Sequence, residues 1–109
     1  MIGKIIEVTV DRPMGSVHPR HKDLRYPINY GYVKGIIGGD GEEQDVYILG
    51  VDAPVASFVG RVVAIIHRLN DTEDKWVVAP EGVSLEKSEI ARLVEFQEKY
   101  FDIEIITEI

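Results

Sequence analysis

The feature that most constrains the fold is a series of short β-forming segments, each ended by a cluster of Gly, Pro, Asp or Asn. The segments predicted as strands are residues 2–10, 24–33, 45–50, 61–68 and 75–79. Turn clusters such as Asp11–Pro13, Gly38–Gly41 and Asn70–Asp74 separate them at nearly regular spacing. A series of this kind is typical of a small antiparallel barrel.

One segment near the end of the chain has helical periodicity instead. The apolar positions that recur at helical spacing are Ile90, Leu93, Val94, Tyr100 and Phe101. Ser84 is the expected N-cap, and residues 102–109 return to strand alternation with Ile103, Ile105 and Ile109 on one side. We therefore predict a mainly β (α+β) fold, a small antiparallel OB-like barrel with one C-terminal helix, in a single domain of residues 1–109.

The charge balance excludes several classes of partner. The chain has 109 residues, 19 acidic against 12 basic side chains and a net charge of −7. Such a chain repels phosphate backbones and anionic lipid, so we expect it to bind neither nucleic acid nor membranes. It has no cysteine, which excludes disulfides and thiolate metal sites. No leader or membrane-spanning run is evident, so a cytoplasmic location is expected.

Two acidic turns are the candidates for chemistry. In the first, Asp40, Glu42 and Asp45 stand between glycines and a strand, where they can converge on one point. Hard cations such as Mg²⁺ need several oxygen ligands in a small space. The second turn, Asn70–Asp74, ends in Lys75, and an ammonium beside carboxylates suits a site that shares an anionic ligand with a metal. Taken singly, an acidic turn of this kind is more often a solvated hairpin tip.

A tyrosine-rich segment is the third candidate. Residues 26–32 read Tyr-Pro-Ile-Asn-Tyr-Gly-Tyr. Tyrosine hydroxyls donate to phosphate oxygens without adding charge to an anionic site. The alternative is that these rings fill the core.

Together these motifs resemble the heart of the soluble (family I) inorganic pyrophosphatases. The match runs from Tyr26-Pro27-x-Asn29-Tyr30-Gly31-Tyr32 through Asp40-Gly41-Glu42-x-x-Asp45 to Lys75-Trp76-Val77-Val78-Ala79-Pro80 and the helix ending at Tyr100. It covers most of the chain, with order and approximate spacing kept. The resemblance implies an OB-like barrel that hydrolyses pyrophosphate with Mg²⁺, or another divalent cation such as Mn²⁺, by a metal-activated water, and a homo-oligomer as a possible assembly.

The resemblance also implies roles for individual residues. The expected metal ligands are Asp40, Glu42, Asp45, Asp71 and Glu73. The expected catalytic residues are Asp40, Glu42, Asp45, Lys75 and Tyr30. The expected substrate-binding residues are Tyr26, Tyr30, Lys75, Tyr100, Arg12 and His18. The family's early strands supply charged residues to the site, and this chain has little room for those strands; the candidates to replace these residues locally are Arg12, His18, Arg20 and Lys22.

The sequence departs from the family pattern at several positions. Glu42 stands where the family motif has its middle Asp, Glu43 replaces a Pro, and Phe101 stands where the family tends to place a Lys. These departures leave two other functions open. One is a degenerate relative that binds metal and phosphate compounds without turnover. The other is an OB-type module that binds nucleic acid or protein, although the usual basic groove is missing.

Overall fold

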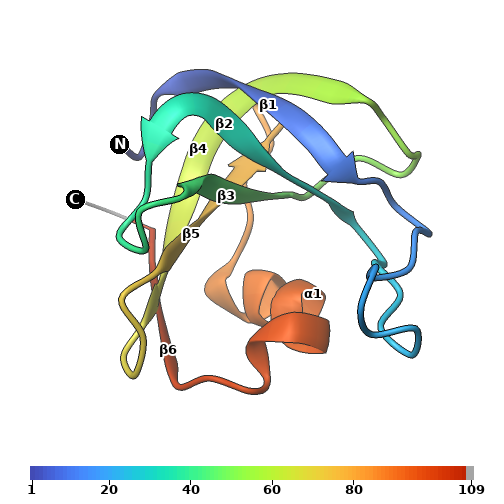
Figure 1. Cartoon of the computed structure of the whole chain (residues 1–109). Helices are drawn as coiled ribbons and strands as arrows, with labels where there is room; N and C mark the ends of the chain where they lie inside the picture. The colour runs from blue at the N-terminus through green and yellow to red at the C-terminus, as the bar shows by residue number, and fades with distance from the viewer. Residues whose placement is uncertain (108–109) are drawn as a thin grey trace.

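A computed structural model describes residues 1–107, and in this range six strands and one helix follow one another. Their bounds are β1 Ile5–Arg12, β2 Asn29–Ile37, β3 Glu43–Ile48, β4 Ser57–Arg68, β5 Asp74–Ala79, α1 Lys87–Glu98 and β6 Ile103–Ile106 (Figure 1). Within residues 1–107, no helix is long and apolar enough to cross a membrane.

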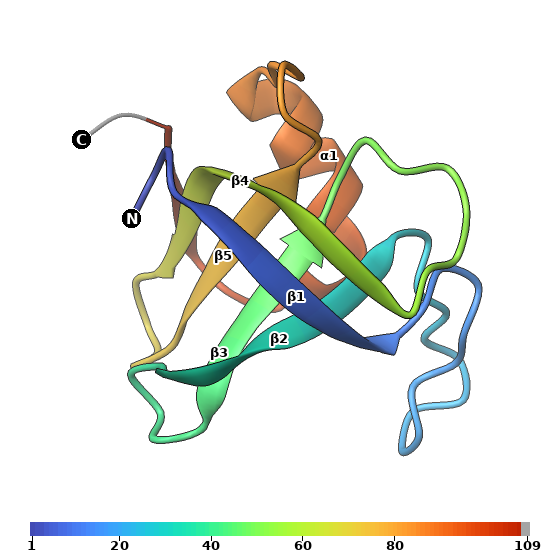
Figure 2. The ribbon, with the colours of Figure 1, turned by 90° about the horizontal axis from the view of Figure 1, so that it is seen from above.

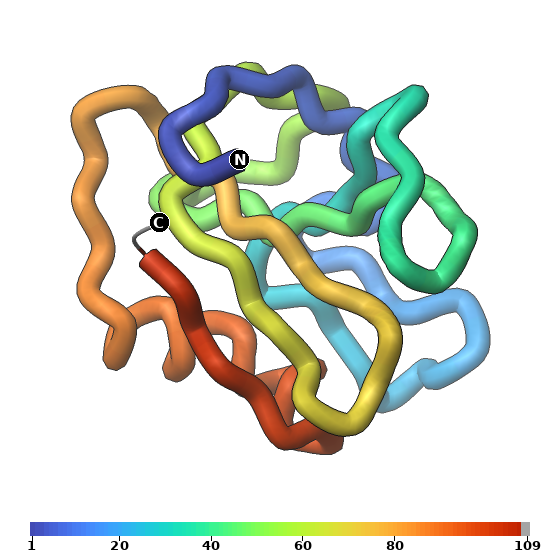
Figure 3. The backbone as a smooth tube through the Cα atoms, turned by 90° about the vertical axis from the view of Figure 1, so that its left-hand side faces the viewer, coloured from blue at the N-terminus to red at the C-terminus, as the bar shows by residue number. Residues whose placement is uncertain are grey.

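Five of the strands close into a barrel. Their order is β1–β2–β3–β5–β4, and β4 pairs back with β1. Figure 2 shows β1 and β4 side by side, crossing above β3 and β5. β6 pairs with the last part of β4, outside the ring (Figure 3). The pairing of β3 with β5 is parallel and the others are antiparallel. The predicted barrel with one late helix is confirmed.

The core has two parts because β3 is buried on both faces. Val46 and Ile48 point into a cluster inside the barrel, and Tyr47 and Leu49 point into a second cluster beneath α1. Successive side chains of a strand face opposite sides, so one strand contributes to both clusters. The helix packs on the second cluster through Ile90 and Val94, which lie one turn apart.

A bulge lets β4 serve both clusters as well. The register of β4 against β5 shifts between Val62 and Ala64. Val62 lies in the cluster inside the barrel, whereas Ala64 and Ile66 lie in the cluster beneath the helix. An extra residue in a strand reverses the side to which later side chains point. The end of β4 therefore faces the helix, where the candidate site lies.

Several predicted element boundaries were wrong. The second strand begins at Asn29 rather than Leu24, because the backbone of residues 24–26 bonds to Ser16 and His18 in the preceding loop. The helix begins after Glu86 rather than at Ser84. There the Glu89 side chain accepts a hydrogen bond from the backbone N–H of Glu86, which satisfies a free donor of the first turn. The strand predicted to reach Ile109 ends at Ile106, and Ile109 lies outside the described residues.

Candidate active site

A cavity of about 730 Å³ opens beside the helix end of the barrel. All six predicted substrate-binding residues line it: Arg12, His18, Tyr26, Tyr30, Lys75 and Tyr100. Asp45, from the start of β3, lines it too. A chain with a net charge of −7 thus gathers four cationic side chains around one space, beside three aspartates; the cations are Arg12, Arg68, Lys75 and Lys99. Such a cavity suits a ligand rich in negative charge.

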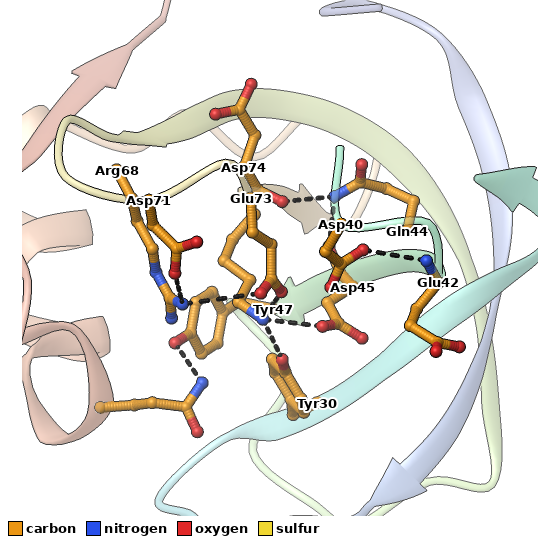
Figure 4. Close-up of polar contacts among 12 residues, drawn as sticks. Tyr30, Asp40, Glu42, Gln44, Asp45, Tyr47, Arg68, Asp71, Glu73 and Asp74 are labelled. Carbon is orange, nitrogen blue, oxygen red and sulfur yellow. Dashed lines mark hydrogen bonds and ion pairs between the residues drawn. The ribbon is translucent and has the colours of Figure 1, made fainter. Parts of the chain in front are cut away.

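Lys75 lines the cavity and forms hydrogen bonds with three polar side chains. Its side chain is buried, and its ammonium donates to the Asp45 carboxylate and to the Tyr30 hydroxyl, both at 2.7 Å. It also donates to Glu73, from the second acidic turn. Figure 4 shows Asp45, Glu73 and Tyr30 directed toward one another from three different strands or turns. Two carboxylates therefore converge on a single cation.

The surroundings of Asp45, Glu73 and Tyr30 shift their pKa values in different directions. Burial and the hydrogen bond shared with Asp45 raise the pKa of Glu73 above its ordinary value. Burial opposes ionisation of Asp45 as well, but its contacts with Glu73, Lys75 and Tyr30 lower its pKa. Burial, together with the charges of Asp45 and Glu73, raises the pKa of Tyr30 well above its ordinary value. Asp45 is thus the ionised acceptor of the group and Tyr30 stays a protonated donor.

A second buried network ties the helix to these side chains. The guanidinium of Arg68 binds Glu98 through two hydrogen bonds of 2.9 and 2.6 Å, and Tyr47 donates to Glu98 at 2.6 Å. Although burial opposes its charge, the bonds and charge of Glu98 raise the pKa of Arg68 above its ordinary value. The same guanidinium lies 3.6 Å from Asp71 and 3.7 Å from Glu73. Arg68 therefore connects α1 with the second acidic turn.

The predicted metal ligands are brought together only in part. Asp45 and Glu73 meet at Lys75, but Asp40 and Glu42 are exposed in their turn, where Asp40 accepts a hydrogen bond from the backbone of Glu42. Figure 4 shows the Glu42 side chain directed away from the Lys75 group. Within residues 1–107, no three His, Asp or Glu side chains form a group that can hold a metal ion by themselves.

Several residues at the cavity were missed at the sequence level. Asp11, His21, Asp23, Leu24, Arg68, Gln97, Lys99 and Phe101 complete its lining. Arg68 had a usable signal, because it follows Ala64 and Ile66 on the buried side of its strand. Glu98 had the same kind of signal, because it continues the helical spacing of Ile90 and Val94. A charged residue at a buried position needs an opposite charge, so each of these positions predicts a buried partner without identifying it.

Comparison with known proteins gives a clear result for the fold. No family model matches the sequence, and no curated protein matches it. Solved structures do. An inorganic pyrophosphatase from Neisseria gonorrhoeae matches with a TM-score of 0.67 and 23% identity, over 90% of this chain and 74% of that one. The inorganic pyrophosphatase from Coxiella burnetii matches with a TM-score of 0.71 and 19% identity, over 96% of this chain and 85% of that one. The one from Ehrlichia chaffeensis matches with a TM-score of 0.70 and 21% identity, over 95% of this chain and 85% of that one.

These identities are low, so the likeness lies in the arrangement of the chain and not in close sequence similarity. The matched regions span most of both chains. The chain has the fold of the inorganic pyrophosphatases, and the resemblance found in the sequence is confirmed at the level of the fold.

Proposed function

We propose that this protein hydrolyses a phosphoanhydride, most simply inorganic pyrophosphate, with the help of Mg²⁺ or a related divalent cation. The observation that carries the proposal is the convergence of Asp45 and Glu73 on one cation, at the floor of a cavity lined by Arg12, Lys75 and tyrosine hydroxyls. Pyrophosphate is small and highly charged, and such a cavity matches it with donors and cations. The charge of the cavity and the likeness of the fold to inorganic pyrophosphatases both support pyrophosphate hydrolysis.

The donor set fits a hard dication. Mg²⁺ in proteins is usually bound by one or two carboxylates, with water and substrate phosphates completing its coordination. Asp45 and Glu73 supply two carboxylates that already share the positive charge of Lys75. When bound, the ion would neutralise phosphoryl charge and make water a better nucleophile at neutral pH. Asp40, Glu42 and Asp71 stay predicted ligands.

The side chains of the cavity divide the remaining work. Asp45 is the ionised carboxylate, and it would accept the proton that the attacking water loses. Tyr30 stays protonated and would donate to a phosphoryl oxygen. Arg12 and Lys75 would bind the terminal phosphoryl oxygens and stabilise the departing phosphate. Tyr26, Tyr100 and His18 line the same cavity and would orient the substrate.

Phosphate release from pyrophosphate in the presence of Mg²⁺ tests this proposal. We expect turnover by the wild type and a loss of about two orders of magnitude in Asp45→Asn, as when one group that stabilises a transition state is removed. Asp52→Asn is the matched control, because Asp52 is an exposed carboxylate outside the cavity lining among residues 1–107. A wild type no faster than Asp45→Asn would refute the proposal.

One observation favours a second candidate, a protein that binds metal and phosphate without turnover. Lys75 neutralises the two convergent carboxylates, and within residues 1–107 no third acidic or His side chain completes a metal-holding group. Calorimetry separates the two candidates. Tight, Mg²⁺-dependent binding of pyrophosphate without phosphate release would select the binding protein.

A further inference from the structure

The two acidic turns contact each other just before the strands β3 and β5, which follow them in the chain, begin to pair. β3 and β5 run parallel, and their pairing starts at Val46 with Trp76. In the residues before this pair, a side chain makes the hydrogen bond that joins the two segments. The buried amide of Gln44 donates to the Asp74 carbonyl at 2.7 Å and to the Asp45 carbonyl at 3.0 Å (Figure 4). Gln44 therefore fixes the first turn to the second.

A second contact joins the tips of the turns. A Cβ atom added at Gly39 would lie 2.1 Å from the backbone oxygen of Thr72, whereas real Cβ contacts are essentially never under 3.0 Å. The φ angle of Gly39 is not positive, so its conformation is open to other residues. Glycine is needed here only because the two backbones touch. Any side chain would force the turns apart by about 1 Å.

Both contacts lie next to the convergent carboxylates in the chain. Gln44 directly precedes Asp45, and Thr72 directly precedes Glu73. A shift of either turn is thus passed to a carboxylate with no flexible segment in between. Mg²⁺ requires near-ideal geometry, and a misplacement of about 1 Å can cost on the order of 100-fold in function.

We infer that Gln44 and Gly39 are positioning residues, which hold Asp45 and Glu73 at the separation from which both reach one divalent cation. This inference rests on the proposed function and deepens it. Neither residue supplies a ligand atom to the cation. Groups that orient metal ligands in this way typically contribute about 10- to 100-fold to metal affinity.

The test uses Gly39→Ala and Gln44→Leu, with Mg²⁺ titrated calorimetrically into the full chain without substrate. We expect each variant to bind Mg²⁺ at least about tenfold more weakly. In assays of phosphate release, the Mg²⁺ concentration for half-maximal rate should rise by a similar factor, while the rate at saturating Mg²⁺ stays within about threefold of wild type. A merely structural defect would lower the saturated rate without moving the midpoint.

Gly41→Ala is the matched control for Gly39→Ala. Gly41 lies in the same turn with a φ of +83°, so alanine is strained there, but an added Cβ meets nothing within 4 Å. We expect Gly41→Ala to lose stability and keep its Mg²⁺ affinity. Because both contacts fix one separation, the double variant Gly39→Ala with Gln44→Leu should lose less affinity than the two single losses combined.

Three outcomes decide the inference. Unchanged Mg²⁺ affinity in Gly39→Ala overturns it while leaving the proposed function standing, provided that the wild type hydrolyses pyrophosphate. An equal loss in Gly41→Ala overturns it as well, because strain in the turn then explains the effect. A wild type that neither binds Mg²⁺ nor releases phosphate overturns the proposed function, and this inference with it.

Discussion

The sharpest test of the site is Lys75→Met, because it should move metal affinity and turnover in opposite directions. The Lys75 side chain is buried, with only 5% of its surface exposed, and its ammonium bonds to Asp45, Glu73 and Tyr30. A divalent cation that takes the two carboxylates must first displace this ammonium. Methionine has a similar unbranched shape and removes the charge, so it fills the space without competing.

The size of the effect follows from the contacts. A hydrogen bond to a charged group contributes about 1.5–3 kcal/mol net. Asp45 is 30% exposed, so we take the lower end for one carboxylate contact, which corresponds to Mg²⁺ binding about tenfold more tightly in the variant. Turnover should fall by about 10²- to 10³-fold, because the phosphate loses a buried cation aimed at its developing charge.

The assay pairs calorimetric Mg²⁺ titration with phosphate release under saturating Mg²⁺ and pyrophosphate. Lys34→Met is the control, because Lys34 is an exposed lysine of β2, and both measurements should match the wild type. Weaker Mg²⁺ binding in Lys75→Met would refute the reasoning. It would mean that the lysine organises the carboxylates for the metal instead of competing with it.

Three further predictions concern the helix anchor, the loop and the metal. Glu98→Ala leaves the buried Arg68 guanidinium with Asp71 and Glu73 at 3.6 and 3.7 Å only, so urea denaturation should show a loss of about 3 kcal/mol, the lower end for a broken buried pair. The exposed helix position Glu95→Ala should change stability by less than about 0.5 kcal/mol, and equal losses would contradict the anchor. The ring of His18 accepts hydrogen bonds from the backbone of the same loop, and burial with nearby positive charge lowers its pKa. A lowered pKa favours the neutral ring when folded, so protection of the loop amides from hydrogen exchange should fall as pH drops below the ordinary value of 6.5. In His18→Asn, whose oxygen accepts the same bonds without titrating, protection should not change over that range. Chelation of divalent cations should abolish turnover and leave the far-ultraviolet circular dichroism unchanged, because neither core cluster contains a predicted metal ligand; unfolding on chelation would show a structural metal instead.

Local patterns were enough to predict the strands and the helix, because the apolar residues of each element recur at the spacing typical of that element. They were less informative about loop residues 24–28, whose backbone bonds within its own loop in competition with the sheet. The buried positions of Arg68 and Glu98 also follow from local periods. Their pairing does not, because it joins a strand to a helix thirty residues later.

The acidic turns also show what local sequence patterns leave undetermined at the site. Asp40 and Asp45 were both predicted as metal ligands from the sequence. In the structure Asp45 belongs to a strand and points at Lys75, whereas Asp40 belongs to the turn and bonds to the backbone two residues later. Which of two nearby acids enters a site depends on the residue at which the strand begins, and boundaries are the least certain part of any pattern.

The parallel pairing of β3 with β5 also has a consequence for folding. These strands are separated in the chain by the whole of β4, so Asp45 and Glu73 meet only after that long segment has folded back into the ring. A chain in which β3 and β5 have not paired has no convergent carboxylates. A cation that binds only the paired form would stabilise it by mass action, and its capture during refolding would report the moment at which β3 and β5 pair.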